Sequence, residues 1–374
     1  MNGIVPQLDS AAKTNAHDDR KLVKKGDFAI NSRSDRRGSC GVSEYDGSVS
    51  LINTVMKPRD EMNPDYYNWL FHTIQFADEF YKWGHGIVDD LWTTNWQDMK
   101  HIDIPVPTLD EQKVIADYLN KAIPEIDALH TDIEKQIETL EEYKKSIITE
   151  AVTKGLDPDV EMKDSGIELI GQIPNEWKIS RLGWISKKIG DGIHGTVTFE
   201  DGETNFYFIN GNNIKKRNIA IKDNTQRITE RIYNTYKTNL TTHTILISLN
   251  GTIGNLAFYN NENVLLGKSV GFIELKEEYN REYIYYLLQA NYIKTIFELS
   301  FAGTTINNLS LQTLRKTNVL LPPKTEQKKI VKYLDKKCAE IDGAIEEKKE
   351  QLDTLEQYKK SVIYEYVTGK KEVQ

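Results

Sequence analysis

A short basic segment near the N-terminus holds the side chains whose chemistry is easiest to interpret. Residues 32–37 read Ser-Arg-Ser-Asp-Arg-Arg. An arginine can donate two hydrogen bonds to a guanine edge or grip a phosphate, and a serine hydroxyl can also bind phosphate. We therefore take Ser32, Arg33, Ser34, Arg36 and Arg37 as candidate DNA-binding residues. The alternative is a solvated turn in which an arginine pairs with Asp35.

A second candidate segment, 210–217, combines amides with cations. It reads Asn-Gly-Asn-Asn-Ile-Lys-Lys-Arg. Asparagine side chains can pair with adenine edges, and lysine and arginine bind the phosphate backbone. The candidates are Asn210, Asn212, Asn213, Lys215, Lys216 and Arg217. An ordinary hairpin turn is an equally good interpretation, because Asn-Gly is a strong turn signal by itself.

Residues 191–196, Asp-Gly-Ile-His-Gly-Thr, resemble a catalytic loop because they hold an aspartate and a histidine. No nucleophile and no metal-ligand spacing accompany them, so we interpret the segment as a structural loop near DNA, with His194 and Thr196 as candidate contacts.

Two further motifs could indicate an enzyme, and we reject both. Asn63-Pro64-Asp65-Tyr66 differs by one residue from the Asn-Pro-Pro-Tyr signature of amino-methyltransferases. Its Asn is better explained as a helix N-cap, like Asn280 in the second half, and no glycine-rich cofactor loop is found in the right context. The acidic set at 158–163 is too crowded for a nuclease site.

Two long, similar segments must position these loops. Glu111–Thr153 and Glu326–Thr368 align without a gap at a constant offset of 215 residues (326 − 111), with roughly half the positions identical. In the first copy Ile126, Ile133, Leu140 and Ile147 recur every seven residues. This spacing predicts two long helices that pair as an antiparallel coiled coil. Pro124 predicts a kink or a restart in the first helix.

The segments before the helices have mixed α/β patterns. Residues 243–249 and 264–275 are expected strands, and 280–297 has helical spacing. Residues 26–31 and 64–80 repeat this strand and helix in the first half. The fold class is therefore α/β (α+β) domains alternating with two long helices. We expect a first domain at 1–107, a helical spacer at 108–155, a linker at 156–173, a second domain at 174–322 and a second spacer at 323–370.

Charge and cysteine content leave nucleic-acid binding possible and argue against a disulfide framework. The net charge is −8, but many acids lie in the repeated helices, whereas cations cluster at Arg20-Lys21, Lys24-Lys25 and residues 215–217. Phosphate binding needs a local positive patch rather than a positive total. Cys40 and Cys338 fall in different halves, and no apolar run or signal peptide is evident. We expect a reduced, cytoplasmic protein without a metal site or cofactor.

An ordered, duplicated set of motifs gives the chain a family resemblance. The first half has Gly26-Asp27-Phe28 and Asp46–Thr54, and the second has Ile173-Pro174 with Trp177, Asp191–Thr196 and Asn250–Gly254. Both helices open with a proline and then a Glu-Gln pair, and both close on Tyr-Lys-Lys-Ser and Val-Thr. The chain thus resembles the DNA-specificity subunit of type I restriction–modification systems.

The resemblance implies two target-recognition domains that each read half of a split DNA site. It also implies that the paired helices fix the spacing and dock two methyltransferase subunits, that restriction subunits join this complex, and that the chain itself is not catalytic. It adds Asn250 and Thr252 to the candidate DNA contacts.

One asymmetry qualifies this expectation. Met1 projects onto position 216 (1 + 215), so the first half lacks a counterpart of Trp177–Lys215. Either the first domain is shortened or the start codon lies upstream. The competing hypotheses are a truncated protein that binds methyltransferase subunits but reads at most one half-site, and a fused DNA-modifying enzyme.

Overall fold

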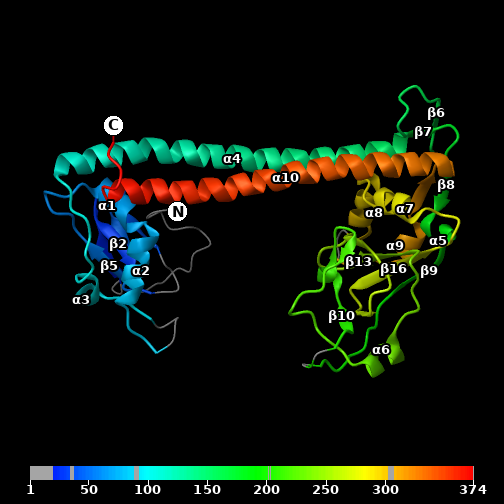
Figure 1. Ribbon diagram of the computed structural model, residues 1–374, viewed down its shortest axis with the longest axis horizontal. Helices are drawn as coiled ribbons and strands as arrows, with labels where there is room; N and C mark the ends of the chain where they lie inside the picture. Colours follow the sequence, from blue (N-terminus) through cyan, green and yellow to red (C-terminus); the bar gives the residue numbers. More distant parts are fainter. Residues whose placement is uncertain are drawn as a thin grey trace. The chain divides into compact units, whose positions relative to one another are not determined.

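The computed structural model divides the chain into two compact units (Figure 1). Unit 1 comprises Met1–Ile137 and Glu346–Gln374, and unit 2 comprises Glu138–Ile345. The residues that the structure describes are 20–33, 38–87, 92–200, 202, 204–301 and 307–373. Within these ranges no helix is both long and apolar enough to cross a membrane.

Unit 1 is built around a three-stranded antiparallel sheet. Its strands are β1 (Arg20–Val23), β2 (Phe28–Asn31), β3 (Cys40–Val42), β4 (Gly47–Ser50) and β5 (Asn53–Met56), and its short helices are α1 (Pro64–Phe71), α2 (Ile74–Lys82) and α3 (Trp96–Met99). The sheet has the order β3-β2-β5, and β1 pairs with β4. Phe28, Ile30 and the aromatic side chains of α1 and α2 form the core.

Unit 2 contains a larger version of the same arrangement. Its strands are β6 (Met162–Asp164), β7 (Gln172–Pro174), β8 (Lys178–Arg181), β9 (Ser186–Asp191), β10 (Tyr207–Ile209), β11 (Ile214–Lys215), β12 (Asn218–Ile219), β13 (Thr244–Ser248), β14 (Leu256–Phe258), β15 (Val264–Leu266), β16 (Val270–Leu275) and β17 (Asn318–Leu321). Its short helices are α5 (Leu182–Ile185), η3 (Gly211–Asn213), α6 (Glu230–Tyr236), α7 (Arg281–Leu287), α8 (Asn291–Phe301) and α9 (Leu311–Lys316). The main sheet has the order β14-β13-β16-β9, and β17 pairs with β8.

The two units repeat one another strand by strand. The pair Ala29–Val55 of β2 and β5 corresponds to Leu246–Phe272 of β13 and β16, with both partners moved by 217 positions (246 − 29 and 272 − 55). Loop contacts repeat as well. Arg33 bridges to Thr93 as Asn250 bridges to Asn308. The duplication expected from the helices therefore extends to the domains.

Sequence predictions for the domain elements are largely confirmed. The strand expected at 243–249 is β13, and the glycine-interrupted stretch at 264–275 forms β15 and β16. The helix expected at 280–297 is wrong in one respect, because it consists of α7 and α8 with a break after Leu287. The expected linker contains the β6–β7 hairpin.

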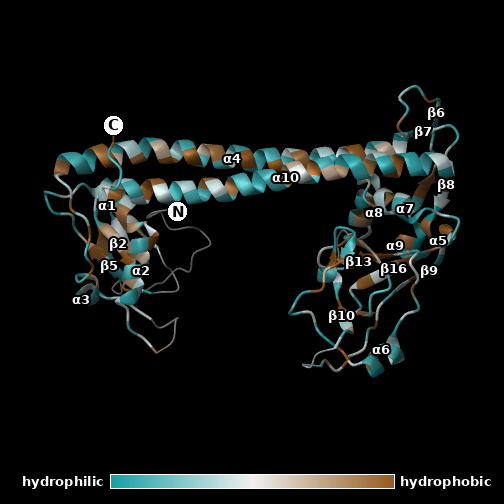
Figure 2. Ribbon diagram, viewed as in Figure 1, coloured by the Kyte–Doolittle hydropathy of each residue, from teal (hydrophilic) through white to brown (hydrophobic). Residues whose placement is uncertain are grey.

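The two repeated segments form α4 (Leu109–Lys154) and α10 (Lys324–Val367). In unit 1 Lys359 pairs with Asp127 and Lys348 donates to Gln136, so the helices run antiparallel there. In unit 2 Lys144 pairs with Asp342. Helix α4 continues through Pro124 without a second start, so the predicted restart is wrong. Figure 2 shows polar and apolar residues interspersed along both helices.

Both helices are part of the domain cores. Ile147 and Ile148 of α4 are buried in unit 2, and the equivalent Val362 and Ile363 of α10 are buried in unit 1. The predicted stripe is only partly buried, since Leu129, Tyr143 and Tyr358 are each more than half exposed. The helices therefore anchor the domains at their ends and keep apolar surface in between.

Candidate nucleic-acid interface

Several loops of unit 2 converge on the β15–β16 turn. Ile193 bridges to Gly267, and the Gly211 amide donates to Ser269 Oγ at 2.9 Å. The Leu249 amide donates to the Ser269 carbonyl, also at 2.9 Å. Loops 191–196, 210–213 and 249–254 thus meet around Gly267–Ser269, although they are far apart in sequence. We call these four segments the unit 2 loop edge.

Glycine makes the convergence possible at two points. A Cβ on Gly192 would lie 2.1 Å from the Leu266 carbonyl oxygen, so only glycine allows this approach. Gly251 has a φ of +69°, a left-handed conformation that other residues adopt at a cost. The backbone geometry therefore explains why glycine follows Asp191 and Asn250 in these loops.

The side chains at the unit 2 loop edge are polar and largely solvent-accessible. His194, Thr196, Asn212 and Thr252 are exposed, whereas Asn210 and Asn250 are half-buried. These six predicted candidates lie in one set of adjoining loops. They offer amide, hydroxyl and imidazole groups, which can hydrogen-bond both base edges and phosphates.

Two contacts orient this edge. Asp191 Oδ2 lies 2.7 Å from His194 Nε2, and Ser269 Oγ donates to Asn210 Oδ1 at 3.2 Å. The His194 ring is therefore held beside a carboxylate at the surface, and one face of the Asn210 amide is already used. The remaining groups of both residues are available to a ligand.

Lys268 is an exposed cation at the centre of the unit 2 loop edge that the sequence reasoning missed. It lies in the turn between two buried strands. A single lysine in the glycine-containing sequence Leu-Gly-Lys-Ser carries no signal of its own, and only the fold places it among the candidates.

Asn213 and Arg217 lie in the second predicted segment, but the structure gives both side chains intramolecular roles. Asn213 Oδ1 accepts from the Asn210 amide at 3.0 Å, and its Nδ2 donates to the Ala220 carbonyl at 2.9 Å. Arg217 donates to Asp335 of α10 at 2.8 Å. The segment does contain a hairpin turn, at Lys216-Arg217 between β11 and β12, whereas Asn210-Gly211 opens the helical turn η3.

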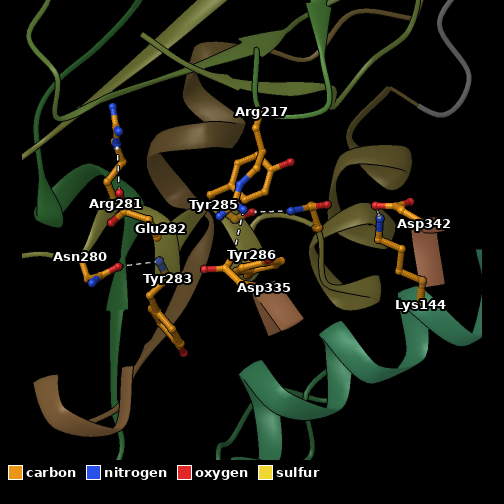
Figure 3. A network of polar contacts seen from close by, with 11 residues as sticks. Lys144, Arg217, Asn280, Arg281, Glu282, Tyr283, Tyr285, Tyr286, Asp335 and Asp342 are labelled. Atoms are coloured by element: carbon orange, nitrogen blue, oxygen red, sulfur yellow. Dashed lines mark hydrogen bonds and ion pairs between the residues drawn. The ribbon is translucent and has the colours of Figure 1, made fainter. Parts of the chain in front are cut away.

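Arg217 connects the β11–β12 turn to α10 (Figure 3). Its guanidinium carbon lies 5.1–5.4 Å from the ring centres of Phe258, Tyr285 and Tyr286. Tyr286 Oη also donates to Asp335, at 2.8 Å. Lys215 and Lys216 stay exposed at the same turn. We call Arg217, Asp335 and the three rings the Arg217 clamp.

Unit 1 places its candidates at the equivalent position. Arg33 is exposed at the end of β2, where Asn250 follows β13, and Ser32 Oγ lies 3.3 Å from Thr54 Oγ1. Ser34, Arg36 and Arg37 lie outside the described residues. The Ser32 amide donates to the Ile52 carbonyl, as the Leu249 amide does to Ser269. Two segments chosen separately from the sequence are therefore the same loop in the two units.

Three features of the described residues bear on catalytic chemistry: metal-ligand clusters, the two cysteines and the Asn63 motif. No cluster of three or more His, Cys, Asp or Glu residues suits a metal ion there. Burial raises the pKa of the Cys40 thiol to about 12 and also raises the pKa of Cys338, so neither is a reactive thiolate. Asn63 caps α1 by accepting from the amides of Asp65 and Tyr66 at 2.9 and 3.1 Å, which confirms its interpretation as a helix cap.

Comparison with protein families identifies the chain. The family model described as type I restriction modification DNA specificity domain matches residues 3–139 and 174–357, one match in each half of the chain. The chain belongs to this family. The duplicated match agrees with the duplicated architecture.

The chain is also similar to individual specificity subunits of type I restriction enzymes. It is 29% identical over 292 residues to the type I restriction enzyme MjaX specificity subunit of Methanocaldococcus jannaschii, a match that covers 74% of this chain and 61% of that protein. It is 27% identical to the MjaVIII specificity subunit of the same organism, covering 87% and 74%. The first match thus spans less than two thirds of the relative's length.

Solved structures share the fold. A chain from a type I restriction–modification complex matches with a TM-score of 0.72 at 16% identity, covering 94% of this chain and 84% of that one. The HsdS subunit of Thermoanaerobacter tengcongensis matches with a TM-score of 0.52, also at 16% identity, covering 95% and 84%. The predicted fold class is confirmed.

Proposed function

We propose that this chain is the DNA-recognition and scaffold subunit of a type I restriction–modification complex, and that it binds a bipartite DNA site without catalysing a reaction itself. One observation carries the proposal: two units of the same fold present equivalent polar loops, around Arg33 in unit 1 and Asn250 in unit 2. Because these side chains differ, the two units would read different half-sites.

The chemistry of the loops supports DNA as the ligand. Asn210, Asn212 and Asn250 offer amides for adenine edges, and Arg33 offers a guanidinium for guanine or phosphate. Lys215, Lys216 and Lys268 are exposed cations in unit 2 that suit the backbone. Asn213 and Arg217 are left out of the proposed interface because their polar groups are engaged within the chain.

The long helices are proposed as the docking site for two methyltransferase subunits, with restriction subunits joining the assembled complex. Leu129, Tyr143 and Tyr358 leave apolar surface exposed on α4 and α10, which partner helices could cover. Since the helices occur as two equivalent copies, they offer two equivalent docking sites. The same helices would fix the spacing between half-sites.

Substitution of the two equivalent loop residues tests the proposal. DNA would be selected from a random pool by the chain, co-expressed with its methyltransferase partner, and the bound sequences would be compared for Arg33→Ala and Asn250→Ala. Each variant should relax one half of a split motif and leave the other half unchanged, with a cost of about 1–3 kcal/mol per lost base contact. Identical effects of both variants, or none, would contradict recognition by two units.

The second candidate function is that of a protein that binds partner subunits but does not read both half-sites. The elements described in unit 1 favour it. Among the described residues, unit 1 has no counterpart of β9 or of the loop that carries His194. Such a protein would still bind methyltransferase subunits through α4 and α10 but would read at most one half-site. In the selection experiment it would yield a motif that responds only to Asn250→Ala.

A further inference from the structure

One hydrogen bond between a domain and its long helix recurs in both units. In unit 1, Trp69 Nε1 of α1 donates to Asn120 Oδ1 of α4 at 2.9 Å. In unit 2, Tyr286 Oη of α7 donates to Asp335 Oδ1 of α10 at 2.8 Å (Figure 3). We call these two hydrogen bonds the register pairs.

The register pairs occupy equivalent positions. Trp69 and Tyr286 differ by the domain offset of 217 positions (286 − 69), and Asn120 and Asp335 differ by the helix offset of 215 (335 − 120). Both residues change between the units, from Trp to Tyr and from Asn to Asp. In each unit, however, an aromatic side chain of the domain donates to a side-chain oxygen of the helix. The contact is therefore retained although both of its residues differ.

A neighbouring contact is not retained in this way. Tyr66, which lies one turn before Trp69 in α1, donates through Oη to the Val367 carbonyl at 2.7 Å. The equivalent Tyr283 in α7 is fully buried, yet its Oη has no hydrogen-bond partner. One polar contact between domain and helix is thus lost in unit 2, whereas the register pair is present in both units.

Apolar packing alone does not determine the position of a domain along its helix. The buried apolar side chains of α4 in unit 1 recur every three or four residues, at Ala116, Leu119, Ile123 and Ile126. A domain displaced by one helical turn would therefore meet apolar side chains again. A polar pair removes this ambiguity, because displacement leaves its donor without an acceptor.

The sequence offers the register pairs no second acceptor within one turn in the directions that matter most. The residues one turn from Asp335 lack a side-chain carboxylate or amide; they are Val331, Lys332, Cys338 and Ala339. Ile123 and Pro124, one turn beyond Asn120, lack one as well. Tyr286 is buried, so a displaced hydroxyl would be left unpaired away from water, which is unfavourable.

We propose that the register pairs are positioning contacts, which select one position of each domain along its long helix. The consequence for DNA rests on the proposed function: if the helices fix the spacing between half-sites, the register of each domain on its helix is part of that spacing. One helical turn is about 5.4 Å, or one to two base pairs. Loss of a register pair should therefore change the spacer and leave the bases preferred in each half-site unchanged.

Unit 1 offers the cleaner test, because Asp335 of unit 2 also binds Arg217. Trp69→Phe removes the indole N–H, and Asn120→Leu removes the acceptor at an exposed position. Asn120→Asp supplies the acceptor found in unit 2 and is the conservative variant. Lys121→Ala, at the exposed neighbouring position, is the matched control.

The register is measured directly, without DNA, as the distance between two spin labels on the full chain. Labels at Gln75→Cys in α2 and Glu125→Cys in α4 occupy exposed positions of unit 1. The native Cys40 and Cys338 are both buried. The label distance therefore reports the position of the domain along α4.

Loss of the register pair should populate a second label distance, displaced by up to about 5 Å. Trp69→Phe and Asn120→Leu should each increase this population about five-fold, the effect expected for one hydrogen bond. The double variant should do no more than either single variant, because both remove the same contact. Asn120→Asp and Lys121→Ala should keep the distance distribution of the unmodified chain.

Selection of DNA from a random pool then compares the same variants. Trp69→Phe and Asn120→Leu should select sites with more than one spacer length and the same bases in both halves. Lower stability with an unchanged distance distribution and an unchanged spacer would overturn the proposal, since the contacts would then be structural only. A changed distance distribution in a chain that selects no split motif would support the positioning role and contradict the proposed DNA recognition.

Discussion

The Arg217 clamp gives the sharpest test of the structure, because the residue combines a strained backbone with several side-chain contacts. Arg217 has a φ of +74°, donates to Asp335 and lies over three aromatic rings. Replacing it with alanine removes the contacts and keeps the strain. Replacing it with glycine removes the contacts and relieves the strain.

The magnitudes follow from exposure and geometry. A hydrogen bond between charged groups contributes about 1.5–3 kcal/mol, but the Arg217 and Asp335 side chains are 34% and 43% exposed, so we take about 1 kcal/mol. Stacking over the rings adds about 1 kcal/mol. We expect Arg217→Ala to destabilise unit 2 by about 2 kcal/mol.

Glycine should cost less than alanine here, which reverses the usual order. A left-handed conformation costs a non-glycine residue about 1–2 kcal/mol, whereas glycine loses about 0.5–1 kcal/mol more chain entropy than alanine on folding. Arg217→Gly should therefore be about 0.5–1 kcal/mol more stable than Arg217→Ala.

Denaturant unfolding of both variants, followed by a signal from unit 2, measures the difference. Lys216→Ala is the matched control, since the neighbouring side chain is 82% exposed and lies 3.9 Å from Asp342, and it should change stability by less than about 0.5 kcal/mol. If Arg217→Ala matched the control, or if glycine were the worse replacement, the clamp would not act as described.

Three further predictions concern the loop edge, the helices and pH. Gly192→Ala should destabilise unit 2 by about 1–3 kcal/mol in thermal unfolding, because its Cβ would meet a carbonyl, whereas Gly195→Ala, with open space around it, should not. Removing one helical turn from both α4 and α10 should shorten the spacer in selected DNA sites by one or two base pairs, since a turn spans about 5.4 Å and a base pair about 3.4 Å. An unchanged spacer would refute the proposal that the helices fix the spacing between half-sites. Burial raises the pKa of the Glu326 carboxyl above its ordinary value of 4.5. The protonated carboxyl therefore favours the folded state below pH 4.5, and this contribution to stability is lost as the pH rises through the pKa of the folded protein. Glu326→Gln should remove this pH dependence. Hydrogen bonds from the Thr108 side chain and backbone lower the pKa of the equivalent Glu111, so titration of the two carboxyls by NMR should show shifts of opposite sign.

The opposite behaviour of Glu111 and Glu326 shows why an aligned repeat does not predict local environment. Trp177 donates to Glu326 Oε2 at 3.0 Å in unit 2, whereas Glu111 accepts from the Thr108 amide at 2.8 Å and from its hydroxyl. The sequence places the two glutamates in register. It does not reveal that Trp177 covers Glu326 in unit 2. The described residues of unit 1 contain no equivalent tryptophan beside Glu111.

The long helices, the strand at 243–249 and the N-cap role of Asn63 were predictable because each depends on local sequence. Periodicity and capping chemistry act within a few residues of the chain. The convergence of loops 191–196, 210–213 and 249–254 was not predictable, since it depends on the order of strands in the sheet. The same limit applies to Lys268, which has no signal in the sequence and lies at the loop edge, and to Arg217, which was chosen from the sequence and contacts Asp335 of α10.

The equivalence of Arg33 and Asn250 lies between these cases. Both were chosen from the sequence for their chemistry, but the helix offset of 215 would not align them. The true domain offset of 217 appears only from strand registers. The chemistry of the two side chains could thus be predicted from the sequence. Their equivalent positions in the two units could be recognised only from the fold.

Co-expression of the chain with the proposed methyltransferase subunit, followed by mapping of methylated adenines across the host genome, tests the central claim most directly. The proposal predicts a split, asymmetric motif, because units 1 and 2 present different side chains at equivalent loops. A symmetric motif, or no methylation, would contradict recognition of two half-sites by the two units.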